Sequence, residues 1–279
     1  MKKYLVKLFD FLRIESTLKK YYKWTKFRFV QFLNNTFNVN VIKQNFDYKL
    51  IPIIIISFNQ LFYLKKLINF LKVHNYKNIV IIDNNSSYQP LIKYFNEIES
   101  TVTIHRLKQN YGHLVFWKVK ELFEQYSNGY YAITDADINP IEECPEDFLL
   151  YFKKVLNKNM NITKVGYSLK IDDIPDTNFN KEKIVKWESQ FWRSKTNEGD
   201  FKAGIDTTFA LYRPKYIHDE GSFLRGCRTN FPYSARHGGW YINNNELTDE
   251  QIFYFKSCND SSSWRVDKNG DLINQDYNI

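Results

Sequence analysis

Short apolar runs alternate with helical repeats along the first half of this chain. The runs are rich in β-branched and aromatic residues, which is typical of strands buried on both faces of a sheet. They cover residues 50–56, 78–82, 102–106 and 130–133. Between them, apolar residues recur at helical spacing from Leu61 to Leu71, and a second helix is expected from Pro90 to Glu97. This alternation predicts a doubly wound α/β fold, whose ligands bind beyond the carboxyl ends of the strands.

The second half of the chain carries a less regular pattern. Residues 164–172 alternate like a strand, and a charged helix containing Trp187 and Glu188 follows. Residues 203–212 predict another strand, with Asp206 near its start. We expect one catalytic domain over residues 46–258, followed by a polar tail over residues 259–279.

Residues 1–45 predict a basic, aromatic helical extension. Apolar residues at helical spacing indicate one or two amphipathic helices within residues 1–37, and the polar stretch from Asn34 to Asn45 reads as a linker. Such an arm can attach to an anionic inner membrane face, or it can pack on the catalytic domain or on a second subunit. The sequence alone leaves both interpretations open.

Charge is distributed unevenly along the 279 residues. The net charge is +8, and residues 1–30 hold nine basic side chains against Asp10 and Glu15. The remainder is close to neutral, which argues against a broad nucleic-acid surface. The three cysteines are far apart and fit neither a disulfide framework nor a zinc site, and no signal peptide or membrane-spanning run is recognisable. We therefore expect a cytoplasmic protein, with peripheral membrane association through the extension as one alternative.

Polar and acidic residues follow the predicted strands directly. Ser57 ends the first strand, Asp83 the second, and Asp135 the run 130–133, with Asp137 two residues later. The carboxyl ends of parallel strands meet at one edge of a sheet, so these side chains should line a common site. Two carboxylates this close repel each other unless a cation lies between them, and Mg²⁺ or Mn²⁺ suits that role when phosphate oxygens complete the shell.

Four segments together resemble a GT-A glycosyltransferase of the family-2-like group. They are Ile53 to Asn59, Ile82-Asp83-Asn84-Asn85-Ser86, Asn110-Tyr111-Gly112 and Thr134-Asp135-Ala136-Asp137, and they match in order and spacing across residues 50–140. The resemblance implies a Rossmann-like nucleotide-binding half with a mixed central sheet. It also implies transfer of a sugar from a nucleotide-sugar, with a UDP-sugar favoured, to a glycan or lipid-linked acceptor in surface polysaccharide or lipopolysaccharide synthesis.

The resemblance also implies roles for individual residues. Ser57, Asn59 and Asp83 would hold the nucleotide base and ribose, and Asn110 and Gly112 would lie near the donor. Asp135 and Asp137 would bind the sugar-nucleotide and the metal. His237, in a glycine-containing loop, suits a third metal ligand or a diphosphate contact, and Arg236 suits a phosphate.

The catalytic base is not marked by the pattern that the family would imply. The family's Gln-x-x-Arg-Trp signature is absent, and no Glu-Asp pair stands at the usual base position. Inverting transfer, the expected outcome, needs a carboxylate near the acceptor hydroxyl. We rank Asp206 first, because partial burial at the start of a strand would raise its pKa, then Glu188 and then Asp173. The tryptophans Trp187, Trp192 and Trp240 either stack on sugars or pack in the core.

Three other classes of protein fit the sequence less well. A haloacid-dehalogenase-type phosphatase also uses Asp-x-Asp, but it needs Thr or Val where this chain has Asn139. A nucleotidyltransferase needs a glycine-rich, basic triphosphate loop, which residues 56–60 lack. A catalytically inactive module that binds a sugar nucleotide at a membrane is the non-enzyme alternative, and donor turnover separates it from a glycosyltransferase.

Overall fold

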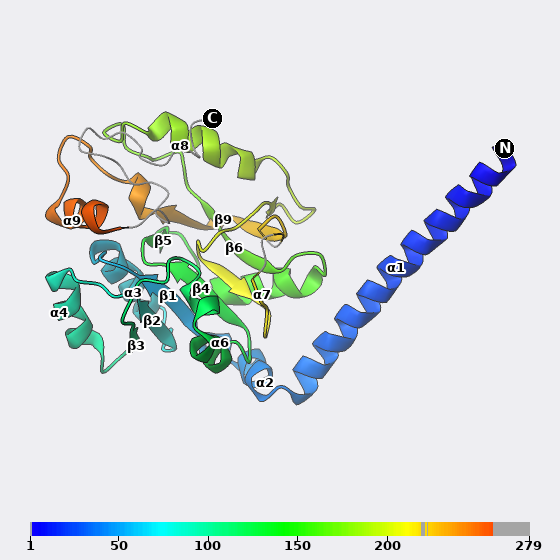
Figure 1. Cartoon of the computed structure of the whole chain (residues 1–279), viewed down its shortest axis with the longest axis horizontal. Coiled ribbons are helices and arrows are strands. Elements are labelled where there is room, and N and C mark those ends of the chain that lie inside the picture. Colours follow the sequence, from blue (N-terminus) through cyan, green and yellow to red (C-terminus); the bar gives the residue numbers. More distant parts are fainter. Residues whose placement is uncertain (1, 219–220, 222, 259–279) are drawn as a thin grey trace.

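The computed structural model describes residues 2–218, 221 and 223–258, with the backbone alone for residues 2–15. The expected tail over residues 259–279 therefore lies outside the described residues. Within the described chain, nine strands form one mixed sheet (Figure 1). The strands are β1 (Ile53–Ser57), β2 (Ile79–Asp83), β3 (Thr103–Arg106), β4 (Tyr131–Asp135), β5 (Ile138–Pro140), β6 (Lys164–Leu169), β7 (Phe201–Lys202), β8 (Ala210–Tyr212) and β9 (Gly226–His237).

The sheet has a parallel half and a mixed half. The order is β3-β2-β1-β4-β8-β6-β9-β5, with β7 paired to β9. Strands β3, β2, β1 and β4 run parallel, and β8 and β5 pair antiparallel with their neighbours. The predicted mixed α/β fold with a doubly wound parallel half is thus confirmed in its architecture.

Helices cover both faces of the parallel half because its strands are apolar on both sides. In β1, Ile53 and Ile55 pack into a core with α3 (Phe62–Val73), α4 (Gln89–Ile98) and α7 (Phe148–Lys158). The alternate residues Ile54 and Ile56 face a second core with α5 (Val115–Lys118) and α6 (Lys120–Tyr126). Side chains alternate along a strand, so an unbroken isoleucine run needs apolar partners on both faces.

The N-terminal region is one long helix followed by a short one. Helix α1 (Lys2–Phe37) extends away from the domain, and α2 (Val39–Phe46) joins it to the sheet (Figure 1). The prediction of a polar linker over Asn34–Asn45 was wrong, because the Asn38 side chain caps α2 and Val41 is buried in the core. Within the described residues, no helix is both long and apolar enough to cross a membrane.

The side-chain amide of Gln44 fastens α2 to the strand region before β4. Its Nε2 donates to the carbonyl of Tyr130 at 2.9 Å, and its Oε1 accepts from the Tyr130 amide at 2.8 Å. A Cβ on Gly129 would stand 2.5 Å from the Gln44 side chain, so only glycine permits this approach. Two backbone groups that lie beyond the end of the ladder are thereby satisfied in a buried place.

Two elements of the second half differ from expectation. Of the predicted strand 203–212 only β8, Ala210–Tyr212, is paired, and the residues before it form a loop. The predicted charged helix is present as α8 (Lys181–Glu188), continued by a 3₁₀ turn over Ser189–Trp192. A further helix, α9 (Asp249–Ser257), packs beyond the carboxyl end of the sheet (Figure 1).

Candidate active site

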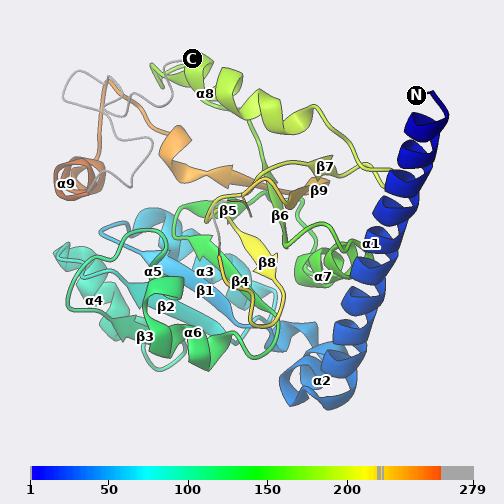
Figure 2. The same cartoon turned by 45° about the vertical axis from the view of Figure 1, so that its right-hand side comes forward.

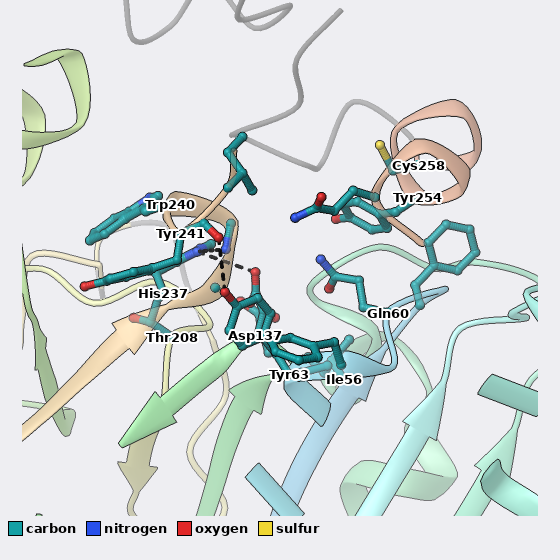
Figure 3. A pocket seen from close by; sticks show the side chains of 18 of the residues that line it. Ile56, Gln60, Tyr63, Asp137, Thr208, His237, Trp240, Tyr241, Tyr254 and Cys258 are labelled. Atoms are coloured by element: carbon teal, nitrogen blue, oxygen red, sulfur yellow. Dashed lines mark hydrogen bonds and ion pairs between the residues drawn. The ribbon is translucent and has the colours of Figure 1, made fainter. Parts of the chain in front are cut away.

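A cavity of about 930 Å³ lies beyond the carboxyl ends of β1, β2 and β4, where a doubly wound sheet binds its ligands. The segments after these strands supply its floor, the loop after β9 one wall, and α9 another. Figure 3 shows Asp137, Tyr63 and His237 gathered on one side, with Gln60, Tyr254 and Cys258 on the other. The sequence therefore predicted the position of the cavity, but not the elements that close it.

Asp135 and Asp137 both line this cavity. Asp135 is the last residue of β4, while Asp137 lies in the turn before β5 rather than within the strand. Thr207 Oγ1 donates a hydrogen bond to Asp135 Oδ2 at 2.8 Å. Burial, and to a smaller extent the negative charge of Asp137, raises the pKa of Asp135 to about 8. A cation bound between these groups would offset both causes.

His237, at the end of β9, lies beside the Asp137 carboxylate. Its Nδ1 lies 3.4 Å from Asp137 Oδ2 and accepts a hydrogen bond from the Gly239 amide at 3.2 Å. The Trp240 ring stacks on the imidazole at 5.0 Å and an interplanar angle of 10°. Adjacent ligands of an octahedral Mg²⁺ or Mn²⁺ stand about 3 Å apart, so the spacing of this pair fits one edge of such a shell, and the Nδ1 lone pair would have to exchange the Gly239 amide for the ion.

The three predicted metal ligands do not form a complete site on their own. Throughout the described part of the chain, no group of three or more His, Cys, Asp or Glu side chains could by itself hold a metal ion. The structure brings Asp137 and His237 together, and it places Asp135 in the same cavity. The assignment of all three to one metal stays a prediction, and it requires ligand atoms from outside the protein.

Ser57 and Asp83 are adjacent residues in the β1–β2 ladder and are fully buried. Asp83 Oδ1 accepts from the Ser86 amide at 3.0 Å, and Arg106 Nε lies 3.5 Å from Oδ2. Among the residues that the structure describes, Asp83 Oδ2 and Ser57 Oγ have no hydrogen-bond partner. Buried polar atoms without partners are costly. Both side chains lie behind the cavity lining rather than on it.

Asparagines hold the loops around this region. Asn59, at a positive φ of 52°, accepts hydrogen bonds from the amides of Ser87 and Tyr88 at 2.8 and 3.0 Å, so it supports a loop and does not line the cavity. Asn84, which sequence reasoning did not assign to the site, donates to the Gly112 carbonyl at 3.1 Å and accepts from the Tyr111 amide at 3.2 Å.

The predicted Asn110 and Gly112 both line the cavity. Asn110 Oδ1 accepts from the Gly112 amide at 2.8 Å, and Gly112 adopts a φ of 78°, which favours glycine. The short helix α5 follows this segment.

The three candidate bases lie in different surroundings. Asp206 lines the cavity but is exposed in the loop before β8, so the predicted burial at a strand start is wrong. Glu188 also lines the cavity and is buried against Arg228 in a close ion pair. Burial raises the pKa of Glu188, and the positive charge of Arg228 opposes that rise. Asp173 is outside the cavity lining.

Arg236 and Asp173 bind each other. Arg236 Nη2 lies 2.8 Å from Asp173 Oδ2, and Arg236 Nη1 donates to Glu142 at 2.7 Å. The Tyr241 hydroxyl also donates to Asp173. Because two carboxylates engage its guanidinium and it does not line the cavity, the contacts of Arg236 give the predicted phosphate role no support.

Glu250 on α9 was missed because its partners are distant in sequence. Its Oε1 accepts hydrogen bonds from the Leu61 and Phe62 amides, at 2.9 and 3.0 Å, and so caps α3, whose own N-cap residue makes no side-chain bond. Ser257, at the other end of α9, accepts from Asn59 Nδ2 at 2.9 Å. Helix α9 is thus fastened at both ends over the mouth of the cavity.

Comparisons with known proteins give a distant structural likeness only. No protein-family model matches the sequence, and no curated protein matches it. Solved structures similar to this chain include the mannosyltransferase PcManGT from Pyrobaculum calidifontis in complex with GDP-Man and Mn²⁺, with a TM-score of 0.43 and 10% identity over 74% of this chain and 60% of that chain. Residues 1–349 of S. aureus TarS are similar, with a TM-score of 0.42 and 13% identity over 68% of this chain and 60% of that chain. This chain spans about three fifths of the length of each. At these TM-scores the likeness is no guide to activity, which has to be inferred from this chain's own cavity.

Proposed function

We propose that this protein is a metal-dependent glycosyltransferase of the GT-A type, which moves a sugar from a nucleotide-sugar to an acceptor hydroxyl. The observation that carries the proposal is the placement of Asp135 and Asp137 at the end of β4, with His237 beside Asp137 in a cavity of about 930 Å³. A cavity of this size accommodates a nucleotide-sugar. Its acidic wall suits a diphosphate only when a divalent cation lies between them.

The donor set fits Mn²⁺ or Mg²⁺, which take carboxylate, imidazole and phosphate ligands. Asp137 and His237 would hold the ion, with Asp135 bound directly or through water, and the donor diphosphate would supply further oxygens. When bound, the ion provides Lewis-acid stabilisation of the leaving nucleoside diphosphate.

Ser57 and Asp83 are proposed to receive the nucleotide base or ribose. Ser57 Oγ lacks a hydrogen-bond partner among the described residues and Asp83 Oδ2 has only Arg106 at 3.5 Å, so a nucleoside N–H or hydroxyl would satisfy them once the residues that cover them from the cavity shift. Asn59 holds the neighbouring loop in place, and Asn110 and Gly112 form the adjoining wall. A UDP-sugar is the donor implied by the sequence resemblance.

Asp206 is the proposed base for inverting transfer. It lines the cavity, so an acceptor hydroxyl placed there can give its proton to the Asp206 carboxylate while its oxygen attacks the sugar. Trp187, Phe191 and Phe223 also line the cavity and offer apolar faces to an acceptor. A glycan or lipid-linked acceptor in surface polysaccharide or lipopolysaccharide synthesis is the substrate class that the resemblance implies.

A thermal-shift titration with UDP, GDP, CDP and dTDP, each with Mn²⁺, tests the donor site. We expect the largest stabilisation with UDP, and a smaller one without Mn²⁺ or in Asp83→Asn. Tightest binding of another nucleotide would overturn the UDP assignment. Donor hydrolysis or transfer in the presence of Mn²⁺ then separates an enzyme from an inactive binding module.

A further inference from the structure

The C-terminal part of helix α1 contacts the domain through one face. Gln31 Nε2 donates to the carbonyl of Asn157 at 3.0 Å, and the Phe27 ring lies 4.9 Å from the guanidinium carbon of Arg213. Figure 2 shows α1 passing beside α7, which carries Asn157. These contacts fix which side of the helix points away from the domain.

The opposite face of α1 is apolar and exposed. Two residues turn an α-helix by roughly 200°, so Phe29 and Leu33 lie opposite Phe27 and Gln31. Together with Leu18, Tyr22 and Phe32 they form a stripe whose members are 38% to 67% exposed. The polar interruption, Thr25, donates its hydroxyl to the carbonyls of Tyr21 and Tyr22 at 3.1 and 2.9 Å. The stripe can therefore enter an apolar phase without leaving a hydroxyl unsatisfied.

The flanks of this stripe are basic. Lys19, Lys26 and Arg28 lie next to it along the helix, and residues 16–46 contain no acidic side chain. At the junction of α1 and α7, Trp24, Phe27, Arg28 and Lys158 line a second cavity of about 440 Å³. An apolar stripe bordered by cations and aromatic rings is the arrangement of helices that lie in the interface of an anionic bilayer.

A second copy of the chain is the competing occupant. Positions 18, 22, 25, 29, 32 and 36 alternate in steps of four and three, as the seam of a coiled coil does. In such a pair the residues flanking the seam face each other, and here the charged ones, Lys19, Lys26 and Arg28, are all basic. Their repulsion opposes self-pairing, whereas an anionic surface neutralises them.

We propose that the outward face of α1, residues 18–33, binds the surface of a bilayer rich in anionic lipids. The apolar stripe enters the interface, and the basic flanks contact lipid phosphates. This interaction goes beyond the proposed transfer reaction and does not depend on it.

Co-sedimentation of the full chain with vesicles tests the proposal. We expect binding to vesicles of equal parts phosphatidylglycerol and phosphatidylcholine, and little binding to phosphatidylcholine alone or at high salt. The variant Lys19→Gln/Lys26→Gln/Arg28→Gln should bind roughly 100-fold more weakly, because each cation that is removed lowers the affinity about fivefold. A control with the same charge change elsewhere, Lys77→Gln/Lys93→Gln/Lys120→Gln, should bind as the natural chain does.

A second variant tests the apolar stripe without changing charge. Leu18→Ser/Phe29→Ser/Phe32→Ser should keep the melting temperature, because these side chains are exposed, and should lose vesicle binding. Three results would each overturn the proposal. They are equal binding to neutral vesicles, unchanged binding by either α1 variant, and a dimer in light scattering that is absent in the stripe variant.

Discussion

The buried pair of Glu188 and Arg228 offers the sharpest test of how the cavity wall is held. Both side chains are nearly inaccessible to solvent, at 2% and 5% exposure. Arg228 also donates Nε–H to the Gly204 carbonyl at 2.8 Å and lies 4.1 Å from the centre of the Phe191 ring. Replacing Arg228 by methionine keeps much of the side-chain volume but removes the charge and these hydrogen bonds.

The expected loss follows from what remains behind. Breaking a buried ion pair from one side costs about 3–5 kcal/mol, since the remaining charge has no partner, and we expect Arg228→Met to lower the free energy of unfolding by about 4 kcal/mol. Removing both charges in Glu188→Leu/Arg228→Met should cost less than the single change. Without Arg228 the pKa of Glu188 rises further above its unfolded value of about 4.3. The native variant then binds more protons than the unfolded chain, so its stability should fall as pH rises from about 5 to 8.

Urea denaturation at pH 5 and pH 8 measures both effects. The exposed Arg193→Met serves as the matched control and should change stability by less than about 0.5 kcal/mol. A loss below about 1 kcal/mol in Arg228→Met at pH 8, or a double variant less stable than the single one, would refute this account of the pair.

Three further changes address the site. Asp137→Ala should reduce transfer at least about a thousandfold with the fold intact, whereas the exposed Asp172→Ala outside the cavity should not; full activity in excess EDTA would exclude a metal role. Asp206→Asn should lower turnover about 10²–10⁴-fold with donor affinity unchanged. Near-normal turnover would pass the base role to Glu188, and the turnover of Glu188→Gln, normalised to the amount of folded protein, would then test that role. Glu250→Ala should lower stability by about 0.5–2 kcal/mol through loss of the α3 cap, while the exposed Glu97→Ala should be nearly neutral; equal melting temperatures would show that the cap contributes nothing.

The central strands could be predicted from the sequence because their signal is local. An uninterrupted run such as Ile53–Ile56 has no other stable environment than the middle of a sheet. In the same way, Asp83 and Asp135 come directly after the apolar runs of β2 and β4. Helix α2 was missed because half of its residues are polar, and its stability comes from Asn38 as cap and from Gln44 and Val41 packing on the domain.

The walls of the cavity depend on contacts between distant segments. Glu250 reaches the amides of Leu61 and Phe62 across most of the chain, and nothing near residue 250 in the sequence marks that partner. Asp206 looked like a strand start because apolar residues follow it, yet pairing begins only at Ala210. The sequence could supply the chemical groups of the site but not the surroundings that set their exposure.

Gln44 has a mechanical consequence for the whole molecule. By bonding both backbone groups of Tyr130, it ties the helical arm to the strand that ends in Asp135. A surface that binds α1 would therefore fix the orientation of the cavity relative to that surface. A truncated protein beginning at residue 46 would lack α1 and Gln44, which would leave the buried backbone N–H and C=O of Tyr130 unsatisfied. A truncation intended to spare the domain should therefore begin before Asn38.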